Sequence, residues 1–119
     1  MKIAVYTIAK NEAKHVRQWA KSAQDADHRL ILDTGSTDNT RFIADGYGVD
    51  VHLVQFTPWR FDDARNRALS LLPDDIDICI ALDMDEILQP MWREQLEYYL
   101  GGRPDVTRPR YKYVWSWNP

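Results

Sequence analysis

Three carboxylates lie close together in the segment "ALDMDEIL", at Asp83, Asp85 and Glu86. Carboxylates at this spacing repel one another unless a cation neutralises them. Oxygen ligands of this kind suit Mg²⁺ or Mn²⁺, which complete their coordination with water and phosphate oxygens. An isolated acidic trio is more often a solvated turn, but Asp83 follows the apolar run "DICIAL" and would stand at the exit of a strand. The segment therefore predicts a divalent-cation site that receives a diphosphate-bearing substrate.

A second candidate for chemistry is the tetrad Asp33-Thr34-Gly35-Ser36 in "LILDTGSTDNT". Such a tetrad behind aliphatic residues is typical of the catalytic aspartate of an aspartic protease. Those enzymes are all-β, whereas the residues that follow here have a helical pattern, so the protease interpretation is disfavoured. Asp33 could instead accept hydrogen bonds from a nucleobase N–H or from ribose hydroxyls. Ser36 and Thr37 would either cap the next helix or cradle a phosphate at its start.

Composition narrows the class of partner. The chain has 119 residues, enough for one domain, with 45% hydrophobic and 28% charged residues. Its net charge is −3 and it has no run of basic residues longer than two, which disfavours nucleic acid. No apolar stretch approaches the roughly 20 residues of a membrane span. Cys79, the single cysteine, is expected to be a buried apolar residue, and a cytoplasmic setting is expected.

Strand and helix patterns alternate along the chain. Strands are expected at 2–9, 28–33, 49–56 and 75–83, and the apolar character of 75–83 predicts a central position. Helices are expected at 11–25, 36–48, 61–73 and 89–102. Alternating aromatics at 110–117 predict a further strand, which a second copy could pair with. This alternation predicts an α/β fold, with a mainly parallel sheet between two layers of helices.

Polar residues gather where these strands would end. In an open α/β sheet, ligands bind beyond the carboxyl ends of the strands, so one crevice could collect these residues. Arg65, in the segment after the third strand, could contact a base or a phosphate, or form an ion pair with a neighbouring Asp. The four groups are Thr7, Asn11 and Glu12; Asp33, Ser36, Thr37 and Asp38; the segment "TPWRFDDARN"; and the segment "DMDE".

Four segments, in order, resemble glycosyltransferase family 2, the nucleotide-sugar transferases with the GT-A fold. They are "TIAKNEAKHV", "LILDTGSTDNT", "FTPWRFDDARNRAL" and "ALDMDEIL", and they lie between Lys2 and Leu88. The resemblance implies a Rossmann-like GT-A sheet and a metal-dependent, inverting transfer from a UDP- or dTDP-sugar. The acceptor could be a saccharide, a lipid or a protein.

The resemblance also implies roles for particular residues. Thr7, Asn11 and Glu12 match the nucleotide-contacting loop, while Asp33 matches the acid that contacts base or ribose. Many members have two acids where this chain has Asp33-Thr34, so the base of the donor is not carried over. The residues expected to bind the nucleotide are Thr7, Asn11, Glu12, Asp33, Arg65 and Asp83, and those expected to bind Mn²⁺ or Mg²⁺ are Asp83 and Asp85.

The family places its catalytic base downstream of the segments found here. Glu94 and Glu97 lie on a helix that is expected to face solvent, so no catalytic base is assigned. Residues 1–119 are therefore expected to form a single donor-binding domain, the first part of a longer enzyme. A non-catalytic nucleotide-sugar-binding module is one alternative. A haloacid-dehalogenase-type phosphohydrolase using Asp83 is another, although its loop normally lies near the start of a chain and needs further motifs downstream.

Overall fold

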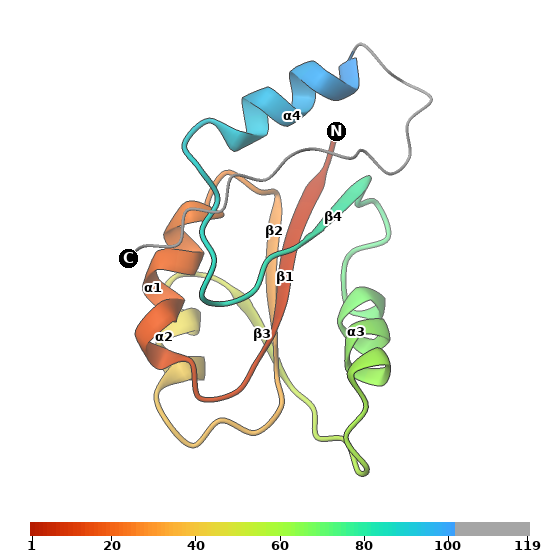
Figure 1. The fold of residues 1–119 in the computed structure, drawn as a ribbon. Helices are drawn as coiled ribbons and strands as arrows, with labels where there is room; N and C mark the ends of the chain where they lie inside the picture. Colours follow the sequence, from red (N-terminus) through yellow and green to blue (C-terminus); the bar gives the residue numbers. More distant parts are fainter. Residues whose placement is uncertain (102–119) are drawn as a thin grey trace.

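The computed structural model describes residues 1–101 and contains one parallel sheet with helices on both faces (Figure 1). The strands are β1 (Ile3–Ala9), β2 (His28–Asp33), β3 (Asp50–Leu53) and β4 (Ile78–Ala81). The helices are α1 (Ala13–Ser22), α2 (Thr40–Gly46), α3 (Phe61–Ser70) and α4 (Trp92–Gly101). The strand predicted at 110–117 lies outside the described residues. Within residues 1–101, no helix is long and apolar enough to cross a membrane.

The strand order is β3-β2-β1-β4, and every pair is parallel. The chain therefore builds outward from β1 to β3 on one side and then crosses to place β4 on the other side of β1. In such sheets, a crevice opens at the carboxyl ends of the two strands where the direction of winding reverses. Here those strands are β1 and β4, so the fold itself selects the region that follows them.

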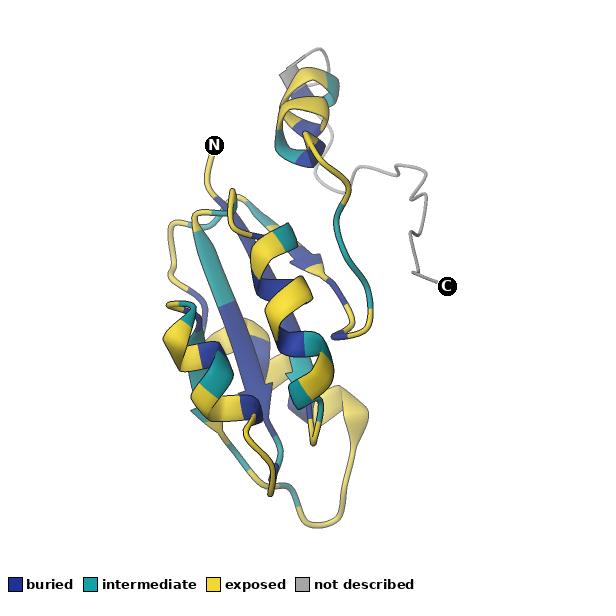
Figure 2. Ribbon diagram, turned by 90° about the vertical axis from the view of Figure 1, so that its left-hand side faces the viewer, coloured by how far each residue is buried: buried dark blue, intermediate teal, exposed yellow. Residues whose placement is uncertain are grey.

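Two apolar clusters make the predicted three layers (Figures 1 and 2). Alternate residues of β1 point to opposite faces, so Val5 belongs to one cluster and Ala4 to the other. The cluster around Val5 includes side chains of α1, α2 and α4, and its largest fully buried member is Trp19. The cluster around Ala4 is closed by Ala64 and Ala68 of α3.

The position of β4 differs from the sequence prediction. It lies at an edge of the described sheet, not at its centre, and it ends at Ala81. Ile80 is buried beneath the α1 face, but Cys79 on the other face is exposed, against the expectation of a buried residue. The reason is that α3 packs mainly on β1 and β2, which leaves that face of β4 without a helical cover.

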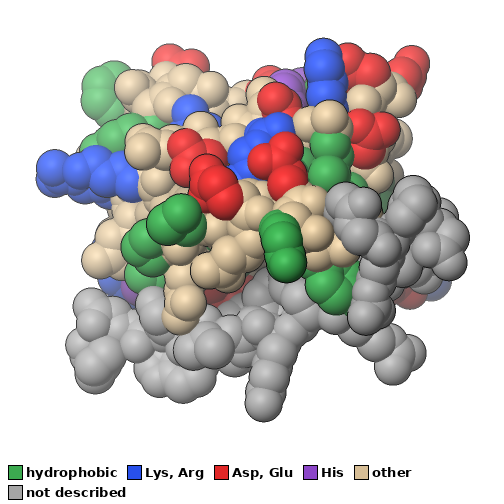
Figure 3. All heavy atoms as spheres, turned by 90° about the horizontal axis from the view of Figure 1, so that it is seen from above, with side chains coloured by type: hydrophobic (Ala, Val, Ile, Leu, Met, Phe, Trp, Pro, Cys, Tyr) green, Lys and Arg blue, Asp and Glu red, His purple; other side chains and the backbone are tan. Residues whose placement is uncertain are grey.

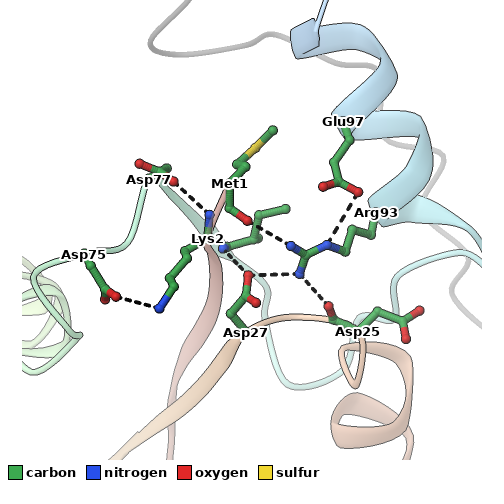
Figure 4. A network of polar contacts seen from close by, with 9 residues as sticks. Met1, Lys2, Asp25, Asp27, Asp75, Asp77, Arg93 and Glu97 are labelled. Carbon is green, nitrogen blue, oxygen red and sulfur yellow. Dashed lines mark hydrogen bonds and ion pairs between the residues drawn. The ribbon is translucent and has the colours of Figure 1, made fainter.

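At the amino end of the sheet, Arg93 fastens α4 to the rest of the molecule (Figure 4). Its guanidinium donates to the carbonyl oxygens of Asp25 (2.7 Å) and Met1 (2.9 Å), and it lies 3.0 Å from the Asp27 carboxylate. Asp27 also accepts a hydrogen bond from Ile3 N (2.8 Å). That backbone hydrogen bond and the nearby guanidinium hold the pKa of Asp27 below its ordinary value. Acidic and basic side chains accordingly lie side by side on this end (Figure 3).

Candidate functional site

The ends of the strands beside β1 are staggered. On one side, β2 pairs with β1 as far as Ala9, which lies opposite Asp33. On the other side, β4 pairs only as far as Tyr6, which lies opposite Ala81. The difference of three residues corresponds to roughly 10 Å along the strand. The polar groups predicted to form one even edge therefore lie on the same end of the sheet but at two levels.

A pocket of about 230 Å³ fills this step, and we call it the notch. It brings together three of the residues predicted to bind nucleotide: Thr7 from β1, Arg65 from α3 and Asp83 from the chain after β4. The Thr7 side chain is buried, and its only hydrogen-bond contact among residues 1–101 is a long 3.5 Å approach of the hydroxyl to the Ile8 carbonyl. Tyr6, Ile8, Phe61, Ala81 and Leu82 complete its wall.

The acidic segment after β4 forms a closed turn. Asp83 N donates to Glu86 Oε1 (2.8 Å), and Glu86 N donates to the Asp83 carbonyl (2.9 Å). Burial raises the pKa of Glu86, and the nearby Asp83 and Asp85 carboxylates raise it further against the opposing effect of the Asp83 N–H. Glu86 is thus committed to the turn, whereas Asp83 and Asp85 are exposed.

Asp83 and Asp85 form an oxygen-only donor set on one turn, which fits a hard divalent cation. No group of three or more acidic, His or Cys side chains within residues 1–101 is arranged to hold a metal alone. A cation here would therefore take its remaining ligands from water and from phosphate oxygens. Asp83 lines the notch, while Asp85 lines neither the notch nor the neighbouring pocket described below.

Side chains from α1 fix the position of this turn. Trp19 Nε1 donates to the Leu82 carbonyl (2.9 Å) inside the core, and Met84 is buried against the same cluster. Ser22 Oγ accepts from Leu88 N (3.1 Å), so the chain beyond the turn is also attached to α1. The acidic turn is therefore held at both ends by one helix.

Asp33 is fully buried at the end of β2. Its Oδ1 accepts hydrogen bonds from Gly35 N (2.8 Å) and Ser36 N (2.7 Å). Its Oδ2 is also buried and has no hydrogen-bond partner among the described residues. A buried carboxylate oxygen without a donor costs free energy, so Oδ2 is an acceptor that a further N–H or O–H group would satisfy. Asp33 itself lines neither of the two pockets described in this section. The parallel sheet also excludes the aspartic-protease interpretation of the tetrad.

Asn11 ties the loop after β1 to the loop after β2. Its side-chain oxygen accepts hydrogen bonds from Thr37 N (2.7 Å) and Asp38 N (3.3 Å). The backbone N–H of Asn11 donates to Ser36 Oγ (2.8 Å). α2 begins at Thr40 and not at Ser36, so neither Ser36 nor Thr37 caps it.

Glu12 has a similar structural setting. Its backbone N–H donates to Thr40 Oγ1 (3.0 Å), and its carboxylate lies 3.9 Å from His15. The Glu12 side chain does not cap α1 and lines neither pocket. The structure therefore places Asn11 and Glu12 in the scaffold that joins the two loops. Arg65, by contrast, makes no ion pair among residues 1–101, so its guanidinium is not committed to a neighbouring Asp.

A larger pocket of about 580 Å³ adjoins the notch, and we call it the aromatic pocket. Its walls carry Phe56, Trp59 and Phe61 from the segment after β3, and Lys10, Thr34 and Gln55 supply polar groups. Ile8 and Phe61 belong to both pockets. Sequence reasoning placed the segment after β3 at the crevice but gave its aromatic residues no role, although their close spacing was a signal that could have done so.

Comparison with known proteins identifies the family to which this chain belongs. The sequence model described as "Glycosyl transferase family 2" matches residues 4–118. The chain belongs to glycosyl transferase family 2. This membership confirms the resemblance and removes the haloacid-dehalogenase alternative. A curated relative of this family 2 chain, an "Uncharacterized glycosyltransferase" of Rickettsia bellii (strain RML369-C), is 28% identical over 104 residues, covering 86% of the chain and 34% of the relative.

Solved structures agree on the GT-A fold of this family 2 chain. Glucosyl-3-phosphoglycerate synthase from Mycobacterium tuberculosis, in complex with Mn²⁺, UDP and glucosyl-3-phosphoglycerate, is 28% identical with a TM-score of 0.66. The match covers 83% of this chain and 39% of the synthase. The match to S. aureus TarS has 18% identity and a TM-score of 0.73. It covers 86% of this chain and 20% of TarS, and it supports the fold alone. The chain thus spans about a third of the length of its curated relative.

Proposed function

We propose that this chain binds a nucleotide-diphosphate sugar together with Mn²⁺ or Mg²⁺ and forms the donor-binding part of a glycosyltransferase. The observation that carries the proposal is the notch, where Thr7, Arg65 and the exposed Asp83 meet, with the exposed Asp85 on the same turn. The Mycobacterium tuberculosis synthase has been crystallised with Mn²⁺ and UDP, and also with UDP-glucose and phosphoglyceric acid. A UDP- or dTDP-sugar is the donor class that we propose here.

Each residue of the site has a distinct part in this proposal. Asp83 and Asp85 would hold the cation, which would neutralise the diphosphate of the leaving nucleotide. Arg65 lines the notch together with Asp83, and its free guanidinium would bind a phosphate oxygen. Asp33 would accept a hydrogen bond from the nucleoside through its unpartnered Oδ2. We also propose that Asn11 and Glu12 contact the nucleotide, because both follow the end of β1.

The group that accepts the proton from the attacking hydroxyl is proposed to lie outside residues 1–101. An inverting transfer, which we propose for this chain, requires such a base. Glu94 and Glu97 are exposed on α4, which is fastened to the amino end of the sheet (Figure 1). The notch lies beyond the carboxyl ends of the strands. Neither residue is therefore assigned a catalytic role.

A second candidate function is a nucleotide-sugar-binding module without transferase activity. The notch itself supports it, since binding a nucleotide sugar needs only the residues that line this pocket and no catalytic base. Residues 1–119 would then act as one donor-binding domain in either case. Turnover of a UDP-sugar by the chain alone, with or without a saccharide, lipid or protein acceptor, would exclude the module.

A cytoplasmic setting belongs to the same proposal, supported by a single cysteine that forms no internal disulfide.

Isothermal titration calorimetry tests the donor site directly. UDP-, dTDP- and GDP-sugars would be titrated into the chain with Mn²⁺ and again with a chelator. We expect binding of at least one of them that depends on the cation. The matched control is Asp45→Asn, which removes an exposed carboxylate on α2 and should leave binding unchanged. Failure of every nucleotide to bind the folded chain would refute the proposal.

A further inference from the structure

We propose that Ser22, the last residue of α1, couples the acidic turn (residues 83–86) to α4, so that cation binding and the docking of α4 stabilise each other. The inference rests on the proposed function, because the cation is part of that proposal. Ser22 lines neither the notch nor the aromatic pocket, so it is a positioning residue and not a ligand contact. Three observations support the assignment, and all of them concern the end of α1.

The first observation is that the connection between β4 and α4 depends on α1 for its position. The connection contains no helix or strand, so contacts with other elements must hold it. At its start, Trp19 Nε1 donates to the Leu82 carbonyl (2.9 Å). Farther along, Ser22 accepts hydrogen bonds from Leu88 N and from Trp92 Nε1, each at 3.1 Å. One residue therefore holds both the end of the connection and the start of α4.

The second observation is that the Ser22 hydroxyl makes a hydrogen bond outside its own helix. It donates to the Trp19 carbonyl (3.1 Å) within α1 and accepts from Leu88 N. Donation by a hydroxyl strengthens it as an acceptor. Ser70 ends α3 in the same way, with its hydroxyl donating to the Arg67 carbonyl (2.7 Å). Among residues 1–101 the Ser70 hydroxyl accepts no hydrogen bond, so the attachment to Leu88 is a feature of Ser22 and not of helix ends in general.

The third observation is the use of the Ser22 carbonyl. The last four carbonyls of an α-helix have no partner within the helix. The Trp92 indole supplies a donor to this one, and its ring is buried in the same core cluster as Leu96 of α4. Arg93 then donates to the Asp25 carbonyl just beyond α1 (2.7 Å), where the helix dipole favours a cation. The start of α4 is therefore docked on the end of α1.

These attachments predict a reciprocal effect between the cation and α4. To bind the cation, Asp83 and Asp85 must be held in one arrangement, and ordering them costs less when the chain beyond the turn is already fixed. Leu88 follows Glu86 closely, so its bond to Ser22 acts on the end of the turn. Coupling between two binding events has the same magnitude in both directions. If a docked α4 raises cation affinity, the bound cation must stabilise α4 to the same extent.

The test combines amide hydrogen exchange with calorimetry. In the unaltered chain, UDP with Mn²⁺ should slow exchange at Leu88 N–H and in α4. Ser22→Ala should accelerate exchange at Leu88 N–H even without ligand, and it should abolish the slowing of α4. Its affinity for UDP with Mn²⁺ should fall about two- to tenfold, which is the effect of one hydrogen bond on an equilibrium.

Two further variants make this comparison specific. Ser22→Thr keeps the hydroxyl and should restore both the affinity and the slowing of α4. Ser70→Ala is the matched control, because it removes the same hydroxyl-to-carbonyl bond at the end of α3 without an attachment to another segment. It should leave both measurements unchanged.

Trp92→Phe tests the coupling from the side of α4, whether or not Ser22→Ala folds. Phenylalanine keeps an aromatic ring but has no N–H for the Ser22 carbonyl. We expect exchange in α4 to accelerate and the affinity for UDP with Mn²⁺ to fall, although Trp92 lines neither pocket. Added to Ser22→Ala, the same substitution should cause a smaller loss, because the bond that transmits its effect to the turn is already absent.

Three results would overturn the inference. Unchanged affinity in Ser22→Ala, with faster exchange at Leu88 N–H, would show that the acidic turn does not need this bond. Slowing of α4 by the ligand that persists in Ser22→Ala would show that the coupling takes another route. Fully additive losses in the double variant would show that the two attachments act independently. In each case cation-dependent UDP binding by the unaltered chain leaves the proposed function standing, whereas a folded chain that does not bind UDP with Mn²⁺ would refute both.

Discussion

The indole of Trp19 donates a hydrogen bond to the carbonyl oxygen of Leu82, 2.9 Å away and buried in the core. Trp19 lies in the middle of α1, and Leu82 immediately precedes Asp83. The carbonyl would otherwise be a buried acceptor at the point where β4 ends, so the bond satisfies it and sets the start of the acidic turn. A residue deep in the core thereby positions a carboxylate that reaches the surface.

Trp19→Phe should separate this role from simple packing. The substitution keeps an aromatic ring but leaves the Leu82 carbonyl without its donor, which should lower the free energy of unfolding by about 1 to 3 kcal/mol. Urea unfolding measures this loss. The affinity of the folded molecules for UDP with Mn²⁺ should also fall, beyond any loss caused by unfolded protein. The reason is that the turn that carries Asp83 loses its anchor. Unchanged affinity per folded molecule would contradict the positioning role.

Asp85→Asn and Glu86→Gln should have unequal effects. Asp85 is free in the described residues, and removing one charged ligand should weaken Mn²⁺-dependent binding by roughly tenfold or more, since even supporting partners of metal ligands contribute that much. Glu86→Gln keeps the oxygen that accepts from Asp83 N, so the turn should persist and affinity should change little. Mn²⁺ electron paramagnetic resonance titration distinguishes the two variants. Equal losses would instead make Glu86 a ligand.

Asp33→Asn should reduce nucleoside recognition without unfolding the chain. Asparagine retains the oxygen that accepts from Gly35 and Ser36, while Oδ2 is replaced by an NH₂ group that cannot accept. We expect UDP affinity to fall and pyrophosphate affinity to be retained, with stability changed by less than about 1 kcal/mol. Calorimetry with both probes and urea unfolding provide the comparison. A variant that binds UDP normally would show that Oδ2 receives no ligand group.

Arg93→Lys should loosen α4. Lysine keeps the charge but lacks the planar fork that reaches the Asp25 and Met1 carbonyls together. Amide hydrogen exchange in α4 should accelerate, while exchange in β1 and β2 stays slow. Glu97→Gln is the matched control, because it removes only the 3.6 Å pair with Arg93. A pair of this i,i+4 spacing whose acid is exposed contributes less than about 1 kcal/mol. Uniform acceleration over the whole chain would contradict a local role.

The lowered pKa of Asp27 predicts a specific pH dependence. Its carboxyl titrates below 3.8 in the folded chain, so its contribution to stability is present above the unfolded value and is lost as the pH falls through the folded value. Asp27→Asn should therefore be less stable than the unaltered chain at neutral pH. The gap should narrow in acid, below about pH 4, as measured by urea unfolding across the pH range. A gap independent of pH would contradict the assignment.

The local patterns of the sequence were sufficient for most of the fold. The strand at 28–33 was predicted with its observed bounds, because a β-branched and aliphatic run ends there at Asp33. The strand expected at 75–83 was predicted less accurately, because the observed strand is shorter and ends at Ala81. Its end depends on Trp19, which is 63 residues away along the chain, and its exposed face depends on the direction of α3. Such long-range terms have no local signal in the sequence.

The site was predictable to a similar degree. Asp83 and Arg65 were expected at one crevice and meet at the notch. Asn11 was expected to contact a ligand, but its side-chain oxygen is shared among donors of the loop that follows β2, a pairing that only the folded chain reveals. The left-handed backbone at Asn11, with φ of 55°, belongs to the same connection and is tolerated by asparagine more readily than by most residues.

The early end of β4 has one more consequence. β4 pairs with β1 only as far as Tyr6. Beyond Tyr6, this edge of β1 has no strand partner among residues 1–101, and Thr7 and Ile8 line the notch there. Peptide groups offer the same donors and acceptors whatever side chain they carry, proline excepted. Replacing Ile8 would reshape the wall that two pockets share and leave the hydrogen-bonding capacity of the main chain intact. The length of one strand thus decides which peptide groups of β1 stand beside the notch.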